Sequence, residues 1–204
     1  MRRLILLVGL IAGAAFAVNP SLSLKANQPV AEEMQQAYHI LPSASLGLQF
    51  PRSDFLTFNT ELSGTSGWGT GDFSGFSIWS AALRFGAEFT PIQEWGLYLT
   101  PGIMLGYAAE RNPYADTMGN IGDRSYSGGG FGLFLNGGIP LVRSRNWQIA
   151  FELGVDVLSF PTDRARVDPG WSPYYPYYYS ANLSSLNIGF VFKRNQNPSG
   201  ARGK

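Results

Sequence analysis

The stretch Trp79-Ser80-Ala81-Ala82-Leu83-Arg84-Phe85-Gly86-Ala87-Glu88-Phe89 alternates bulky apolar residues with small or polar ones. A period of two is the pattern of a β-strand, because successive side chains point to opposite faces of a sheet. Trp79, Leu83 and Phe89 share the apolar face, and Arg84 and Glu88 lie on the other. The stretch is also long enough to cross a bilayer, for which a tilted strand needs about 9–11 residues.

The same alternation recurs along the chain. Further strands are predicted at 44–50, 56–62, 95–110, 131–141, 147–157 and 184–192. Because a single-chain bacterial barrel has an even number of strands, an eighth is expected before them, at 18–26. Val30, Met34 and Tyr38 then follow at helical spacing, which allows a short helix in the first loop. The alternative is that residues 18–40 form a plug or a periplasmic helix.

The two faces of these strands differ in side-chain size as well as polarity. The polar face is rich in Gly, Ser, Ala and Asn, which suit a crowded interior, and the bulky apolar face suits lipid. Charged residues make up only 14% of the chain, whereas soluble domains carry about 25%. Aromatic residues recur on the apolar face at the same kind of strand end, as in a membrane girdle: Phe50, Phe89, Trp95, Trp147 and Phe192. The pattern predicts an all-β, closed, antiparallel up-and-down transmembrane β-barrel of eight strands, and not a lipocalin-like soluble barrel.

The connections between the predicted strands alternate in length. Short turns are expected at 51–54, 90–94 and 142–146. Long loops are expected at 64–75, 111–127 and 161–182. Outer-membrane barrels have short periplasmic turns and long extracellular loops. We therefore expect the aromatic strand ends to face the periplasm.

The chain begins with Met1-Arg2-Arg3, continues with an apolar run and reaches Ala15-Phe16-Ala17. A basic start, a short apolar stretch and small residues at a cleavage site are typical of a secretory signal peptide, here residues 1–17. The alternative, a single membrane anchor, needs an apolar run of roughly 20 residues. We expect the barrel to span residues 18–192 in the bacterial outer membrane, with a polar, basic tail at 193–204.

The last predicted strand carries the most specific motif, Leu186-Asn187-Ile188-Gly189-Phe190-Val191-Phe192. With it the chain resembles the small outer-membrane barrel superfamily, the OmpA-, OmpX- and OmpW-type eight-stranded proteins. The resemblance implies that the barrel-assembly machinery recognises this strand through Phe190 and Phe192. In that family the aromatic residue usually ends the chain, whereas here residues 193–204 follow it.

Several charged residues fall on the predicted inner face. Arg84 is expected to be the hub of a lumen charge network that pairs it with Glu152 or Asp156. The other acidic members are Glu61, Glu88 and Glu110. The network is either a gate or weak cation-selective constriction, or an ion-pair plug in a lumen that eight strands leave only wide enough for side chains. Inward glycines favour some unfilled space: Gly102, Gly106, Gly132, Gly154 and Gly189.

No catalytic, cofactor-binding or metal-binding residues are predicted. The chain has no Cys and a single histidine, His39, outside the clear strands, so an acyl-transfer triad has no base placed against a hydroxyl. The glycine run at 127–132 lacks the Lys-Ser/Thr ending of a phosphate-binding loop, and strand glycines in the barrel wall account for it better. A formal net charge of +1 gives no basic excess for nucleic acid.

The loop at 168–179 is unusually rich in Tyr and Trp. Such residues supply rigid contact area in binding loops, or they anchor a loop among lipid headgroups. The candidate contact residues are Trp171, Tyr174, Tyr175, Tyr177, Tyr178 and Tyr179. Two functions follow: a narrow pore or passive permeability barrel for small solutes or ions, and a structural or adhesive surface protein that uses this loop.

Overall fold

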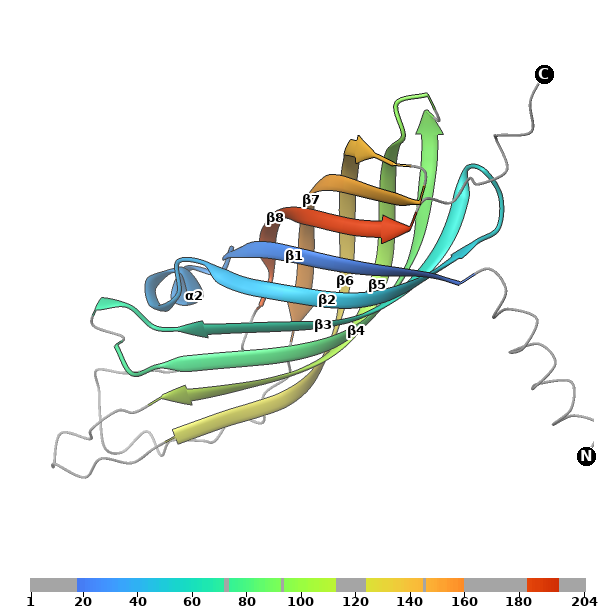
Figure 1. The fold of residues 1–204 in the computed structure, drawn as a ribbon. Coiled ribbons are helices and arrows are strands. Elements are labelled where there is room, and N and C mark those ends of the chain that lie inside the picture. The colour runs from blue at the N-terminus through green and yellow to red at the C-terminus, as the bar shows by residue number, and fades with distance from the viewer. Residues whose placement is uncertain are drawn as a thin grey trace, which may run out of the picture.

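The computed structural model describes residues 18–71, 74–92, 94–112, 124–144, 146–159 and 183–194. In these residues the chain forms a closed barrel in which every strand pairs with its neighbours in sequence order, and β1 pairs with β8 (Figure 1). The strands are β1 (Asn19–Pro29), β2 (Leu41–Pro51), β3 (Leu56–Trp68), β4 (Ser77–Ile92), β5 (Leu97–Asn112), β6 (Arg124–Arg143), β7 (Trp147–Ser159) and β8 (Ser185–Arg194). The predicted eight-stranded antiparallel barrel is confirmed.

All eight pairings are antiparallel, and the seam between the two ends of the chain places Leu24 opposite Phe190. Closure satisfies the backbone donors and acceptors that an open sheet edge would leave unpaired. In the described part of the chain, no helix is long and apolar enough to span a membrane.

Several strands are longer than the sequence predicted. β3 continues to Trp68, and β6 begins at Arg124 and includes Gly128–Gly130, so the loops expected at 64–75 and 111–127 are too long. Backbone pairing does not need large side chains, and Gly129 pairs with Tyr107 of β5. β8 also extends past Phe192 to Arg194, which moves Lys193 from the expected tail into the barrel wall. The expected signal peptide, the loop at 161–182 and the tail beyond Arg194 lie outside the described residues.

The connection between β1 and β2 contains the helix α2 (Glu32–Ala37). It lies at the end of the barrel opposite the β2–β3 turn (Figure 1). β1 itself is a strand, so the alternative in which all of 18–40 forms a plug or periplasmic helix is wrong for its first part. The short helix expected from the spacing of Met34 and Tyr38 is present.

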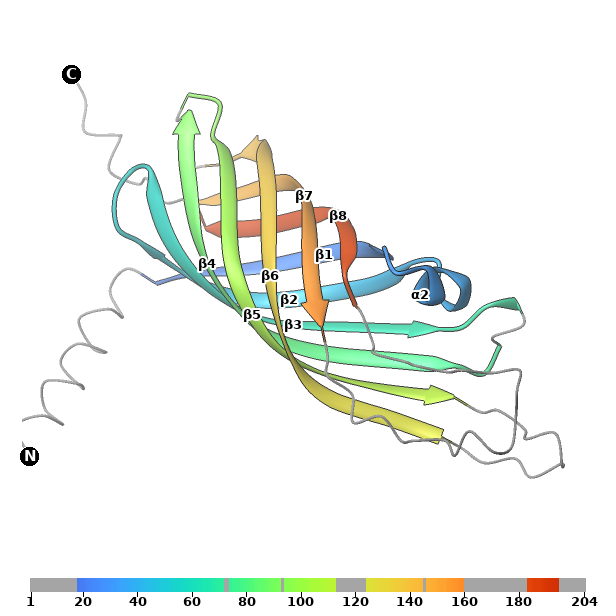
Figure 2. The ribbon, with the colours of Figure 1, turned by 180° about the vertical axis from the view of Figure 1, so that it is seen from behind.

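The outer wall of the barrel is apolar. On β4, Trp79 and Phe89 both point outward, with 51% and 41% of their surfaces exposed. The ten residue steps from 79 to 89 rise about 3.3 Å each along a strand tilted by about 40°, which gives roughly 25 Å. That is the height of the apolar band of an outer-membrane barrel. Figure 2 shows that the neighbouring strands β4, β5 and β6 run side by side along this part of the wall.

Candidate functional site

The barrel interior contains buried ion pairs, and the best defined is between β4 and β7. Arg84 donates from Nη1 to Asp156 Oδ2 at 2.9 Å and from Nη2 to Asp156 Oδ1 at 3.0 Å. Its guanidinium also lies 4.1 Å from the centre of the Phe134 ring, and its Nε lies 4.0 Å from Glu61 Oε2. Two parallel charge-assisted bonds fix both direction and rotation of the guanidinium. Arg84 is therefore held rigidly across the lumen.

A second group of charges lies nearer the short turns. Lys193 Nζ lies 2.8 Å and 2.9 Å from the two carboxylate oxygens of Glu88, and 3.6 Å from the centre of the Tyr98 ring. The Tyr98 hydroxyl donates to Glu152 Oε1 at 2.7 Å, and Lys25 Nζ pairs with Glu152 Oε2 at 2.7 Å. These contacts run without a break from β4 through β8, β5 and β7 to β1.

This arrangement differs from the single network expected around Arg84. Arg84 does pair with Asp156, but Glu88 and Glu152 are held by Lys193 and Lys25. Arg84 is thus one of three inward cations among the described residues. The signal for Lys193 was available in the sequence, since Asn187, Gly189 and Val191 alternate inward and Lys193 continues their series.

Glu110 lies apart from these ion pairs, at the long-loop end. Its Oε1 accepts a hydrogen bond of 3.0 Å from the Tyr38 hydroxyl, and it lies across the ladder from Ile78. Tyr38 follows α2, so this bond ties the first connection to the barrel wall. Glu110 is buried, and the burial of a carboxyl group is tolerated where a donor reaches it.

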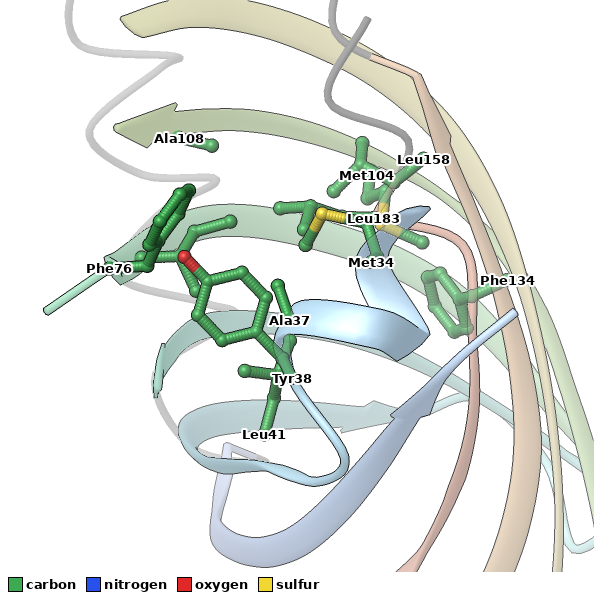
Figure 3. Close-up of a cluster of buried hydrophobic side chains, with 11 residues drawn as sticks. Met34, Ala37, Tyr38, Leu41, Phe76, Met104, Ala108, Phe134, Leu158 and Leu183 are labelled. Carbon is green, nitrogen blue, oxygen red and sulfur yellow. The ribbon is translucent and has the colours of Figure 1, made fainter. Parts of the chain in front are cut away.

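The long-loop end of the interior is filled by a hydrophobic cluster, the outer plug. Met34, Ala37 and Tyr38 enter it from the first connection, and the wall supplies Phe76, Ile78, Met104, Ala108, Phe134 and Leu158. Figure 3 shows the side chains from α2 pointing toward those of the wall. Leu41 and Leu183 complete the cluster. α2 thus closes the lumen on this side with apolar contacts.

The inward glycines do not leave unfilled space. A Cβ added at Gly102 would collide with the Phe134 ring, one at Gly154 with the amide oxygens of Asn136 and Asn187, and one at Gly189 with Lys25. A Cβ at Gly132 would meet Leu158 and the neighbouring backbone. The expectation of open volume at these four positions is therefore wrong. Each glycine makes room for a side chain from another strand.

The other candidate residues fall outside this interior. His39 is exposed beyond α2. In the residues with known positions, no cluster of three or more His, Cys, Asp or Glu is arranged to hold a metal ion. The Tyr- and Trp-rich residues Trp171, Tyr174, Tyr175, Tyr177, Tyr178 and Tyr179 lie outside the described part of the chain.

An apolar outer wall and a closed antiparallel ladder define an eight-stranded β-barrel of the membrane-spanning type. No protein-family model and no curated protein matches the sequence.

Solved structures of small outer-membrane barrels do match. Neisserial surface protein A shares 9% identity at a TM-score of 0.46, with 88% of this chain and 96% of that chain covered. Ail, the attachment invasion locus protein of Yersinia pestis, shares 9% sequence identity at a TM-score of 0.47, and the match covers 87% of this chain and 95% of that chain. The N-terminal barrel domain of Pseudomonas aeruginosa OprF shares 11% sequence identity at a TM-score of 0.41, and the match covers 86% of this chain and 96% of that chain. These similarities concern the fold alone.

Proposed function

We propose that this protein is a closed outer-membrane barrel that does not conduct and that presents its long loops at the cell surface. The observation that carries the proposal is the filling of the interior at two levels. Buried ion pairs occupy the part toward the short turns, and the outer plug occupies the long-loop end. A water-filled path through the lumen would have to break both the ion pairs and the outer plug.

The test is current through planar lipid bilayers that contain the refolded protein. We expect no stable conductance steps for the wild type in concentrated potassium chloride. An established porin, inserted into the same bilayers, controls for the sensitivity of the recording. Reproducible single-channel steps from the wild type would overturn the proposal.

A narrow cation pore is the second candidate, and one observation favours it. Among the described inward residues, acidic groups outnumber basic ones: Glu61, Glu88, Glu110, Glu152 and Asp156 face Lys25, Arg84 and Lys193. A negative excess would attract small cations into any opening. If the bilayer recordings give steps, this candidate requires potassium to pass in preference to chloride.

For the surface function we propose the loop that carries Trp171 and Tyr174–Tyr179 as the contact region. Tyr and Trp combine a rigid apolar body with a polar tip, which suits binding to other surfaces. Deleting residues 171–179 should abolish adhesion of cells that display the barrel, while leaving its amount in the membrane unchanged. Equal adhesion by the deletion variant would remove the loop from this role.

For assembly we propose that the barrel-assembly machinery engages β8 through Phe190 and Phe192. Phe190 points outward beside Phe151, with ring centres 5.9 Å apart. Replacing both phenylalanines with Ser should reduce the folded protein in cells, whereas Leu186→Ser, on the same outward face, serves as the matched control. An equal loss for both variants would indicate a general packing defect instead of recognition.

A further inference from the structure

A groove lies at the long-loop end of the barrel, where the chain passes from β1 through α2 into β2. Its volume is about 390 Å³, and the described residues that line it are Gln28, Gln35, His39 and Ile40. Figure 1 shows α2 at the tip of this hairpin. None of the four residues belongs to the ion pairs or to the outer plug, so the groove is separate from the filled lumen.

The groove continues the lipid-facing wall of the barrel. The ladder between β1 and β2 pairs Asn27 with Leu41, and both side chains are buried inside. Because side chains alternate along a strand, the adjacent Gln28 and Ile40 point outward. Gln28 lies opposite the outward Leu186 of β8, and Ile40 is 63% exposed. A lipid molecule that covers this part of the wall would therefore reach the groove.

Aromatic residues place the groove at the level of lipid headgroups. A Cβ at Gly67 of β3 would collide with the Leu41 side chain, so the next residue, Trp68, points outward near the start of β2 and is 73% exposed. Trp79 and Tyr107 follow on the outer face of β4 and β5, with ring centres 5.6 Å apart. Trp and Tyr side chains prefer the interface between membrane and water. The groove thus meets headgroups and not the middle of the acyl chains.

The lining offers hydrogen-bonding groups that carry no fixed charge. Gln35 Nε2 donates to the carbonyl oxygens of Pro29 at 2.9 Å and Val30 at 3.3 Å, so the side chain presents its Oε1 as an acceptor. The Gln28 amide and the His39 imidazole each supply a donor and an acceptor. Such a set matches hydroxyl groups, which also donate and accept.

A negative charge beside the groove selects against phosphate. Glu32 is exposed on α2, and it lies three residues before Gln35, which makes the two side chains neighbours on the helix surface. We propose that the groove binds an uncharged sugar in the headgroup of a glycolipid, whose acyl chains lie on the apolar wall. The leaflet is the outward one, and this part of the inference rests on the proposed exposure of the long loops at the cell surface.

Purified protein in dodecylphosphocholine micelles provides the test. Dodecyl maltoside has the same alkyl chain with an uncharged sugar headgroup, so its addition changes only the headgroup. We expect saturable NMR shifts of the Ile40 methyl groups and the Gln28 side-chain amide, and nuclear Overhauser effects from sugar protons to Ile40. Shifts that follow the micelle composition without saturation would overturn the proposal.

A pair of variants tests the hydrogen bonds. Gln28→Leu keeps the size of the side chain but removes its amide, so binding should weaken about fivefold for each hydrogen bond lost. Gln36→Leu is the matched control, because Gln36 is exposed on α2 outside the groove. Unchanged binding by Gln28→Leu, or an equal loss in both variants, would contradict the assignment.

Free maltose separates a glycolipid from a soluble sugar. Without an alkyl chain it has no contact with the apolar wall, and at the same concentrations it should leave the resonances unchanged. Equal shifts with free maltose would overturn the lipid part of the proposal. All these measurements use purified protein, so absent binding contradicts the groove, whereas a reversed orientation in cells contradicts the proposed function.

Discussion

Arg84 is surrounded by contacts that compensate its charge in a low-dielectric interior. Two bonds reach Asp156 and an aromatic face lies 4.1 Å away. Removing one partner of a buried pair leaves the other charge uncompensated, which costs about 3–5 kcal/mol. Arg84→Ala should therefore lower the free energy of unfolding by an amount in that range, measured by urea titration of the detergent-folded protein.

A double-mutant cycle with Asp156→Asn separates the pair from the rest of the site. The combined variant should be less destabilised than the sum of the two single variants, since neither charge is then left alone. Additive effects would mean that the pair contributes no coupling. The same Arg84→Ala sample, recorded in bilayers, also tests whether the arginine holds a conducting path closed, in which case new current would appear.

Gly138 illustrates how the interior is packed. A Cβ at this position would collide with the ring and hydroxyl of Tyr98, which itself bonds Glu152. We expect Gly138→Ala to destabilise the barrel by roughly 1–3 kcal/mol, as overpacking does in closely packed cores. Gly64→Ala is the control, because a Cβ there comes no closer than 3.9 Å to the Ser80 carbonyl. Equal unfolding midpoints for the two variants would contradict this packing argument.

The sequence identified which residues face inward and named Asp156 as one of two possible partners of Arg84, but it did not predict the partners of Glu88 and Glu152. Arg84, Glu88, Glu152 and Asp156 lie on the inner face as alternation predicts. Their partners depend on how strands distant in the sequence meet around the barrel, which no local pattern contains. Lys193 of β8 reaches Glu88 of β4 only because the barrel is closed. The role of the glycines was missed for the same reason.

Among the elements, α2 is attached differently from the strands. It has no side-chain cap at Ala31, and the burial of Met34, Ala37 and Tyr38 in the outer plug holds it in place. Met34→Asp places a charge in this apolar cluster and should release the helix. We expect faster hydrogen exchange at the Gln35 and Tyr38 amides, which bond Ala31 and Met34, while β1 remains protected.

Gln36→Asp is the matched control on the exposed face of the same helix. It introduces the same charge without entering the plug, so its exchange rates should stay near those of the wild type. Similar acceleration in both variants would show that the charge destabilises the helix itself and that the plug does not retain it.

The strand ends were the least predictable part of the elements. Residues 125–127 were predicted as the end of a loop, yet together with residues 128–130 they pair with β5 from Gly106 to Arg111. Their pairing follows from the extension of β5 beside them and does not need side-chain packing. The centres of the strands, where bulky residues meet lipid, were predicted with the correct faces.

For the whole molecule, closure predicts resistance to detergent. Because every strand has two hydrogen-bonded neighbours, sodium dodecyl sulfate has no open edge from which to unfold the barrel. The folded protein should migrate differently from a boiled sample on a gel. Identical migration before and after boiling, with folding verified by circular dichroism, would contradict a closed and stable barrel.

The orientation of the molecule in the membrane gives a separate prediction. If the long loops face outward, protease added to intact cells should cut between β5 and β6 or between β7 and β8, within 113–123 or 161–182, and leave the short turns uncut. Fragments are identified by mass spectrometry. A periplasmic marker protein that stays intact controls for leaky membranes, and cuts at the turns near Arg52 or Glu94 would reverse the orientation.

The seam between β1 and β8 has a consequence for the order of synthesis. Leu24 of β1 finds its partner, Phe190 of β8, only after the six strands between them have been made. Hairpins of neighbouring strands can form earlier, but the barrel cannot close before the last strand has been made. Contacts between such distant positions slow folding, because loop entropy is lost before they form. An incomplete chain that is released would therefore have two unpaired edge strands. Aggregation or capture by a chaperone begins at such edges.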